Sequence, residues 1–317
     1  NPGQMALADL ANYQPKRRAP LCHDLAAAGK TVEVCGFPPP SSGATAIGQI
    51  LGILAQTPGA AMKPDAAGLP TADWLHYYTE AARLAFADRA QYVADPDFVQ
   101  PPAGSWMSLL DPAYLKSRAA LIGAQSLKVA QPGQPGALKT SYAPMPDQPE
   151  YGTSHISIVD AFGNALAMTT TIEDAFGARQ MVKGFLLNNE LTDFSFAPTG
   201  ADGQPIANRV QPGKRPRSSM APTLVFEKNA DGSRGPLLMS GGSPGGALII
   251  HYTAKTLHGV LNWGLTPQQA INLPNFGSTN GPSLLEEKKF PPATVEALRT
   301  RGAEVRATAS LASGPCS

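Results

Sequence analysis

The sequence predicts an α/β fold of the α+β type, a layered sandwich of helices packed on antiparallel sheet. Short strand-like runs recur in pairs joined by turns, and longer segments with apolar residues at helical spacing lie between them. With 317 residues, 43% of them hydrophobic, the chain is long enough to bury a large core as one domain or two.

The first 100 residues predict three helices and a strand. Residues 5–13 are a short helical segment, and residues 29–37 are a strand that places Val32 and Val34 on one face. Three prolines stop this strand, and Ser42-Gly43 opens an apolar helix. Thr71 caps a longer helix that runs to about Val93.

The helix that follows Thr71 has an aromatic and apolar stripe, which we assign to packing in the core. The stripe consists of Trp74, Leu75, Tyr78, Ala82 and Phe86. The charged residues Glu80, Arg83 and Arg89 are expected to lie largely off this stripe.

Residues 125–150 contain five prolines and little hydrophobic periodicity, which is typical of an exposed, irregular connector. The connector leads directly to Gly152-Thr153. It is either a linker between domains or a segment that presents a cleavage site, and composition alone does not separate these two interpretations.

A β-hairpin follows, because alternating apolar residues occupy 155–160, a turn occupies 161–164, and a second strand occupies 165–172. Thr153 lies at the start of the first strand. Of the three threonines that end the second strand, Thr169 and Thr171 are expected to share a face, with Thr170 opposite.

The last third continues the mixture of strands and helices. It predicts a short strand at 185–189, a polar loop at 195–213, a hairpin formed by 223–226 and 236–239, and a helix over 247–261. A glycine-rich loop joins the second hairpin to the helix, and no P-loop lysine follows it, so nucleotide binding is not expected.

Composition excludes some classes of partner. The net charge of +1 and the scattered basic residues argue against nucleic-acid binding, and no apolar run approaches the ~18–20 residues of a membrane span. Cys22, Cys35 and Cys316 lack metal-site spacing. Cys22 and Cys35 could bridge adjacent strands in an oxidising compartment or remain free thiols, and both alternatives stay open.

Six motifs occur in an order that resembles one family, the γ-glutamyltransferases (γ-glutamyltranspeptidases or glutathione hydrolases), which are N-terminal nucleophile hydrolases. The motifs are Pro38-Pro39-Pro40-Ser41-Ser42-Gly43, Asp95-Pro96-Asp97-Phe98, Thr153-Ser154-His155, Leu187-Asn188-Asn189-Glu190-Leu191-Thr192-Asp193-Phe194, Lys214-Arg215-Pro216-Arg217-Ser218-Ser219-Met220 and Gly242-Ser243-Pro244-Gly245-Gly246. The resemblance runs from about Leu7 to about Arg306.

The resemblance implies a four-layer αββα sandwich that is incomplete in this chain. Residues 1–152 would be the C-terminal part of a large subunit, and residues 153–317 a small, catalytic subunit without its C-terminal end. We expect a fragment or partial gene product, which starts with Asn1 and carries no signal segment, although the family is usually exported.

The resemblance also implies a catalytic mechanism. Self-cleavage between Gly152 and Thr153 would free the Thr153 α-amine, whose pKa of roughly 7.7–8.0 suits it as the base for its own hydroxyl. The Thr171 hydroxyl would hydrogen-bond Thr153, and the backbone N–H groups of Gly245 and Gly246 would form the oxyanion hole.

The substrate-binding residues are likewise implied by the resemblance. Glu190 and Asp193 would hold the ammonium of a γ-glutamyl group, and Ser218 and Ser219 its carboxylate. Glu173 stands where some members have asparagine and could alter substrate preference. The arginine that clamps the substrate carboxylate would lie in a part of the large subunit outside this chain, and residues 195–213 have no tyrosine to act as a lid.

The expected function is a γ-glutamyl hydrolase and transpeptidase that acts on glutathione, without cofactor or metal. The γ-glutamyl group would pass from Thr153 to water or to an amino-acid or peptide acceptor, in a periplasmic or secreted protein built from two subunits of one precursor. One alternative is a related amidohydrolase, either a glutaryl cephalosporin acylase or a poly-γ-glutamate depolymerase. The other is an inactive fragment, or only a binding module.

Overall fold

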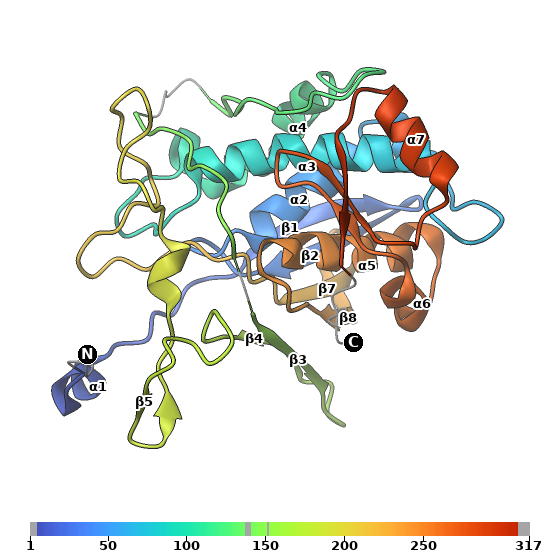
Figure 1. Cartoon of the computed structure of the whole chain (residues 1–317). Coiled ribbons are helices and arrows are strands. Elements are labelled where there is room, and N and C mark those ends of the chain that lie inside the picture. The colour runs from blue at the N-terminus through green and yellow to red at the C-terminus, as the bar shows by residue number, and fades with distance from the viewer. Residues whose placement is uncertain (1–4, 137–140, 151, 310–317) are drawn as a thin grey trace.

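The computed structural model describes residues 5–136, 141–150 and 152–309, and its centre is a four-stranded antiparallel sheet (Figure 1). The strands are β1 (Leu21–Ala27), β2 (Lys30–Gly36), β7 (Thr223–Lys228) and β8 (Arg234–Gly241), in the order β1-β2-β7-β8. Val34 of β2 lies opposite Val225 of β7, so strands from both ends of the sequence meet at the middle of the sheet.

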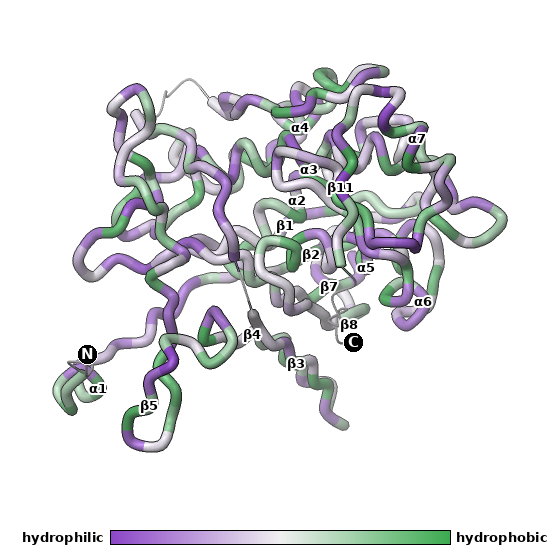
Figure 2. Tube along the Cα trace, in the orientation of Figure 1, coloured by the Kyte–Doolittle hydropathy of each residue, from purple (hydrophilic) through white to green (hydrophobic). Residues whose placement is uncertain are grey.

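Two helices, α2 (Gly43–Leu54) and α5 (Ile249–Trp263), cover one face of this sheet, and α3 (Ala72–Tyr92) packs on α2. Figure 2 shows hydrophobic residues along α2, which contacts both the sheet and α3. The predicted start of α3 is confirmed, because the Thr71 hydroxyl accepts a hydrogen bond from the Trp74 N–H at 3.2 Å. Val32 and Val34 both point into this core, as expected.

Glu80, Arg83 and Arg89 of α3 are buried, contrary to the expectation that they lie largely away from the packed face. Arg83 and Glu80 form an ion pair at 2.5 Å, and neither side chain is exposed. The Arg83 Nε also donates to the carbonyls of Lys128 and Gly281. Segments distant in the sequence therefore cover the second side of α3. The apolar periodicity of the α3 sequence does not predict these contacts.

The connector of residues 125–150 has no helix or strand in its described parts, 125–136 and 141–150, and it follows α3 closely. The Gly133 N–H donates to Asp88 at 2.7 Å, and the Met145 N–H donates to the carbonyl of Ala90 at 3.0 Å. The expected exposure was wrong for Ala130, Ala143 and Met145, which are buried. Residues 137–140 of this prediction lie outside the described residues.

The predicted hairpin at 155–172 is confirmed as β3 (Ser154–Val159) paired with β4 (Ala165–Thr170). The hairpin contacts β8. The strand expected at 185–189 is shorter, because β6 (Phe185–Leu186) pairs only with β5 (Met181–Val182).

The remaining helices and strands lie outside the central sheet and its helices, and α1 has no buried residue. They are α1 (Leu7–Asn12), α4 (Pro112–Ala119), α6 (Pro267–Asn272), α7 (Pro292–Thr300), and β9 (Phe276–Gly277), β10 (Ser283–Glu286) and β11 (Val305–Thr308), which form a sheet in the order β11-β10-β9. The fold is of the predicted α+β class. Of the four expected layers, the described residues form a helical layer and one four-stranded sheet, with the β3–β4 hairpin beside β8.

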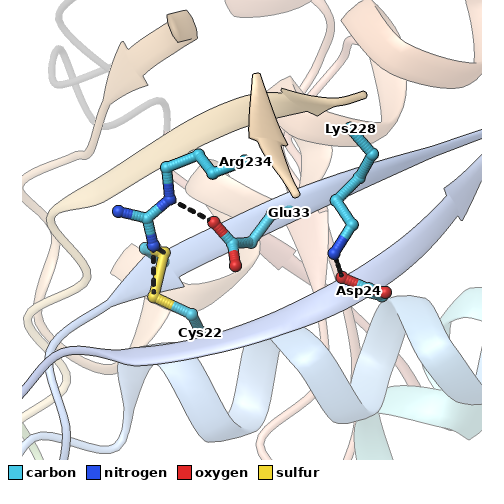
Figure 3. The surroundings of a disulfide bond; sticks show 6 residues. Cys22, Asp24, Glu33, Lys228 and Arg234 are labelled. Atoms are coloured by element: carbon cyan, nitrogen blue, oxygen red, sulfur yellow. Dashed lines mark hydrogen bonds and ion pairs between the residues drawn. A yellow bond between two sulfur atoms is a disulfide. The ribbon is translucent and has the colours of Figure 1, made fainter. Parts of the chain in front are cut away.

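The sheet face turned away from the helices carries a disulfide between Cys22 and Cys35 (Figure 3). Ion pairs between strands join Arg234 to Glu33 and Lys228 to Asp24. The bridge resolves the open question about the two cysteines. Cys316 lies outside the described residues.

The disulfide also accounts for a possible metal cluster. In the part of the chain that the structure describes, Cys22, Glu33 and Cys35 are the only group of three potential metal ligands, and their two sulfur atoms are bonded to each other. Among the same residues, none of the helices combines the length and apolar character that crossing a bilayer requires.

Candidate active site

One small pocket gathers residues from five separate stretches of the chain. It is lined by Glu150, Gly152, Thr153, Thr171, Glu173, Glu190, Asp193, Ser218, Ser219, Met220, Gly246 and Ile249. Every residue assigned to the site from the sequence is in this lining except Gly245, the direct neighbour of Gly246. The free volume is about 20 Å³, room for roughly one water molecule.

The β3–β4 hairpin brings the two threonines together. Thr153 directly precedes β3 and Thr171 directly follows β4, and the register pairs Ser154 with Thr170. Both threonines therefore lie at the open end of the hairpin, where the connector arrives with Gly152.

Both threonine hydroxyls point at the carbonyl of the peptide bond that joins Gly152 to Thr153. Thr153 Oγ1 donates to Gly152 O at 2.5 Å, and Thr171 Oγ1 donates to the same oxygen at 2.6 Å. The expected hydrogen bond from Thr171 to Thr153 is not the one the structure has. The intact peptide bond places its carbonyl oxygen between the two hydroxyls, and this oxygen is the acceptor for both.

Only glycine fits at position 152 without a shift. A Cβ built there would lie 2.6 Å from the carbonyl oxygen of Glu173, well inside the contact distance of two heavy atoms. The backbone of Gly152 therefore packs directly against the segment that follows β4.

Gly245 and Gly246 have positive φ angles of 131° and 57°, which favour glycine. A Cβ at Gly245 would lie 2.7 Å from the Tyr252 ring. Gly246 begins a turn of 3₁₀ helix that leads into α5, so this loop sits at the positive end of a long helix. The loop is a suitable place to stabilise developing negative charge.

One side of the pocket is acidic. Glu173 is buried and accepts a hydrogen bond from the Asn189 amide, while the carboxyl groups of Glu190 and Asp193 lie close enough to shift each other's pKa. Burial, together with the charges of Glu150, Glu190 and Glu173, raises the pKa of Asp193 to about 8. Burial also raises the pKa of Glu190. A bound cation would relieve this repulsion.

The basic side of the pocket is formed by Ser218 and Ser219 and is backed by Arg89, which lies outside the lining. Ser218 donates to the Ser41 hydroxyl at 3.1 Å, whereas Ser219 donates to Glu150 Oε2 at 2.5 Å. Arg89 Nη2 donates to Glu150 Oε1 at 2.8 Å and to Ser219 Oγ at 2.6 Å. The pocket thus offers acceptors at one end and donors at the other, which suits a ligand with both an ammonium and a carboxylate.

Arg89 and Glu150 are site residues that the sequence motifs do not include. Arg89 follows Phe86 by three positions, so it continues the buried stripe of α3, and a charge on such a stripe indicates a buried partner. Glu150 stands three residues before Thr153 in a segment expected to be exposed, and no sequence pattern points to its contacts.

Comparison with known proteins places this geometry in a family. The model described as Gamma-glutamyltranspeptidase matches residues 1–315. The glutathione hydrolase proenzyme of Escherichia coli is 36% identical over 316 residues, which cover 96% of this chain and 50% of that protein. The acylase ACY 1 proenzyme of a Pseudomonas species is 31% identical over 99% of this chain and 50% of that protein.

A solved structure shares the fold. The cephalosporin acylase from Bacillus halodurans matches with a TM-score of 0.76 and 24% identity, over 96% of this chain and 49% of that one. This chain spans about half the length of the curated relatives named above. Since the family model covers nearly all of it, the chain belongs to the gamma-glutamyltranspeptidase family.

Proposed function

We propose that the protein is a γ-glutamyl hydrolase and transpeptidase that acts on glutathione and related γ-glutamyl amides. The observation that carries the proposal is the pocket itself, in which a threonine hydroxyl and an acidic side lie in the lining, and Arg89 lies behind Ser219 on the basic side. A γ-glutamyl group bears an ammonium and a carboxylate on one carbon, and the two sides of the pocket can bind these charges separately.

The first reaction is self-cleavage between Gly152 and Thr153. The Thr153 oxygen attacks the Gly152 carbonyl carbon, the C–N bond breaks, and the proton of the hydroxyl passes to the released α-amine. The product is an ester of Gly152 with Thr153. Water then hydrolyses this ester, which leaves a carboxylate on Gly152 and restores the Thr153 hydroxyl. Thr171, which donates to the Gly152 oxygen, stabilises the negative charge that this oxygen gains.

Turnover uses the same threonine as an N-terminal residue. Its α-amine accepts the hydroxyl proton as Thr153 Oγ1 attacks the γ-carbonyl of the substrate, and then delivers that proton to the departing amine. The γ-glutamyl ester passes to water or to an amino-acid or peptide acceptor. The N–H groups of Gly245 and Gly246 stabilise the oxyanion, while Glu190 and Asp193 bind the ammonium.

We further propose that residues 1–152 and 153–317 act as the large- and small-subunit parts of one precursor in a periplasmic or secreted protein. The disulfide between Cys22 and Cys35 supports the location, because such bonds form and persist in oxidising compartments.

A related amidohydrolase that cleaves glutaryl amides is the second candidate, and the identity of 31% to the acylase ACY 1 proenzyme supports it. The acidic side of the pocket favours the γ-glutamyl function, since a glutaryl group has no ammonium to place beside Glu190 and Asp193.

The two functions are separated by comparing turnover of γ-glutamyl and glutaryl anilides by the processed protein. We expect the γ-glutamyl compound to be cleaved preferentially, and the Asp193→Asn variant to lose that preference. Faster cleavage of the glutaryl compound would favour the acylase function instead.

A further inference from the structure

The carboxylate of Glu150 occupies the basic side of the pocket, three residues before the threonine that would be freed by cleavage. Its Oε1 atom accepts from Arg89 at 2.8 Å, and its Oε2 atom accepts from Ser219 at 2.5 Å. Only 11% of the Glu150 side chain is exposed. A carboxylate from the chain itself therefore stands where the sequence motifs place the carboxylate of a substrate.

This carboxylate is held in its ionised form. Burial alone would raise the pKa of Glu150, but the charges of Arg89 and Arg217 and the hydrogen bonds from Arg89 and Ser219 outweigh it, so the pKa lies below its ordinary value. Arg217 Nη2 is 3.9 Å from Glu150 Oε1. Two buried arginines thus face the Glu150 carboxylate. If this carboxylate moved out of the pocket, the two buried positive charges would be stabilised by another anion.

Arg89 is fixed in place independently of Glu150. Its Nε donates to the Ser42 hydroxyl at 2.8 Å, and its guanidinium lies 5.2 Å from the centre of the Phe86 ring. A planar guanidinium that is already oriented loses little conformational entropy when a carboxylate binds.

We propose that Arg89, together with Ser219, binds the substrate carboxylate, and that Glu150 fills this subsite until cleavage at Gly152-Thr153 releases its segment. This inference rests on the proposed function for the identity of the substrate. It adds a substrate-binding arginine within this chain and an internal carboxylate that keeps the uncut protein from binding substrate.

Movement of Glu150 out of the pocket would also change the pKa of Asp193 on the acidic side. The charge of Glu150 is the largest contribution after burial to the raised pKa of Asp193. When Glu150 leaves, the Asp193 carboxylate ionises more readily and becomes a better partner for an ammonium. Release of one side chain therefore prepares both ends of the pocket.

The test measures binding to the uncut Thr153→Ala chain, so it depends on neither cleavage nor turnover. Calorimetry compares L-glutamate with L-isoglutamine, in which the α-carboxylate is replaced by an amide. We expect the added Glu150→Ala change to tighten L-glutamate binding by about tenfold or more and to create a similar preference over L-isoglutamine.

Arg89→Lys in the Thr153→Ala, Glu150→Ala background should reduce this preference, since lysine keeps the charge but does not reproduce a guanidinium that donates to Ser42 through Nε and to Ser219 and a carboxylate through Nη2. Arg118→Lys is the matched control, because Arg118 is also buried and pairs with a carboxylate, Asp88, at 3.1 Å. Circular dichroism confirms that each variant is folded.

Three outcomes would overturn the inference. They are equal binding of L-glutamate with and without Glu150, absence of a preference for L-glutamate in the folded Glu150→Ala protein, and an unchanged preference after Arg89→Lys. The proposed function fails separately, if the chain that retains Thr153 neither cleaves itself nor turns over a γ-glutamyl anilide.

Discussion

At the scale of single residues, the Gly152 carbonyl is the most informative group because two hydroxyls donate to it. The Thr153 hydroxyl is placed beside the carbonyl it would attack. The Thr171 hydroxyl has no attacking role in this arrangement, so its contribution should come from stabilising the charge on the oxygen.

Thr171→Val should therefore slow self-cleavage without preventing folding. The loss of one hydrogen-bond donor to an oxyanion typically costs about a hundredfold or more in rate, and this sets the expected effect. A time course on denaturing gels measures it. Thr170→Val is the control, since Thr170 is exposed and is the last residue of β4, directly before Thr171. Equal cleavage rates for the two variants would remove Thr171 from the mechanism.

The raised pKa of Asp193 predicts how the free energy of unfolding of the uncut Thr153→Ala chain depends on pH. Its pKa is raised from 3.8 to about 8, so the folded state binds the proton more tightly than the unfolded state. The stabilisation is fully present below about pH 4 and is lost as the pH rises through about 8. After allowance for partial exposure, its size is on the order of 1–3 kcal/mol.

Thermal unfolding between pH 5 and pH 9 measures this effect. The Asp193→Asn variant should lose less stability over that range than its Thr153→Ala parent, whereas Asp202→Asn, in an exposed loop, should behave like the parent. An identical pH dependence in the Asp193 variant and its parent would show that this carboxyl does not hold the extra proton.

At the scale of elements, caps and turns in the local sequence predicted where a helix begins and where a hairpin turns. The Thr71 cap fixed the start of α3, and the turn at 161–164 fixed the β3–β4 hairpin. The burial of Arg83 could not be predicted, because one of its partners, Gly281, lies 198 residues away in the sequence.

The candidate site also combines residues that the sequence predicts with contacts that it does not predict. The motifs predicted ten site residues, and nine of them line one pocket. Their catalytic roles remain predictions. The contacts between Glu150 and Arg89 join a connector to a helix 61 residues earlier, and they arise only when both pack beside Ser219. Such contacts depend on the tertiary structure rather than on local sequence.

A further prediction concerns the stability that the disulfide gives to the β1–β2 pair, in which Cys22 and Cys35 lie opposite each other. A disulfide that closes a short loop typically contributes about 2–4 kcal/mol. Changing both cysteines to serine should lower the melting temperature by several degrees and leave self-cleavage unchanged, since the bridge lies outside the pocket lining. A variant that melts like the parent would assign the bridge no stabilising role.

At the scale of the whole molecule, the central sheet contains two strands from before Thr153 and two from after it. Cleavage at this position would leave both pieces in one core. We expect the two products to remain together in gel filtration under native conditions and to separate only in denaturant. Separation of the products without denaturant would contradict this account of the sheet.

Self-cleavage is the claim on which the mechanism depends, and intact-mass and N-terminal analysis of the purified full-length protein tests it most directly. We predict a new chain that begins at Thr153, and a single uncut chain in the Thr153→Ala variant. One uncut chain in both proteins would contradict this prediction, and would leave a member of the family without a threonine nucleophile.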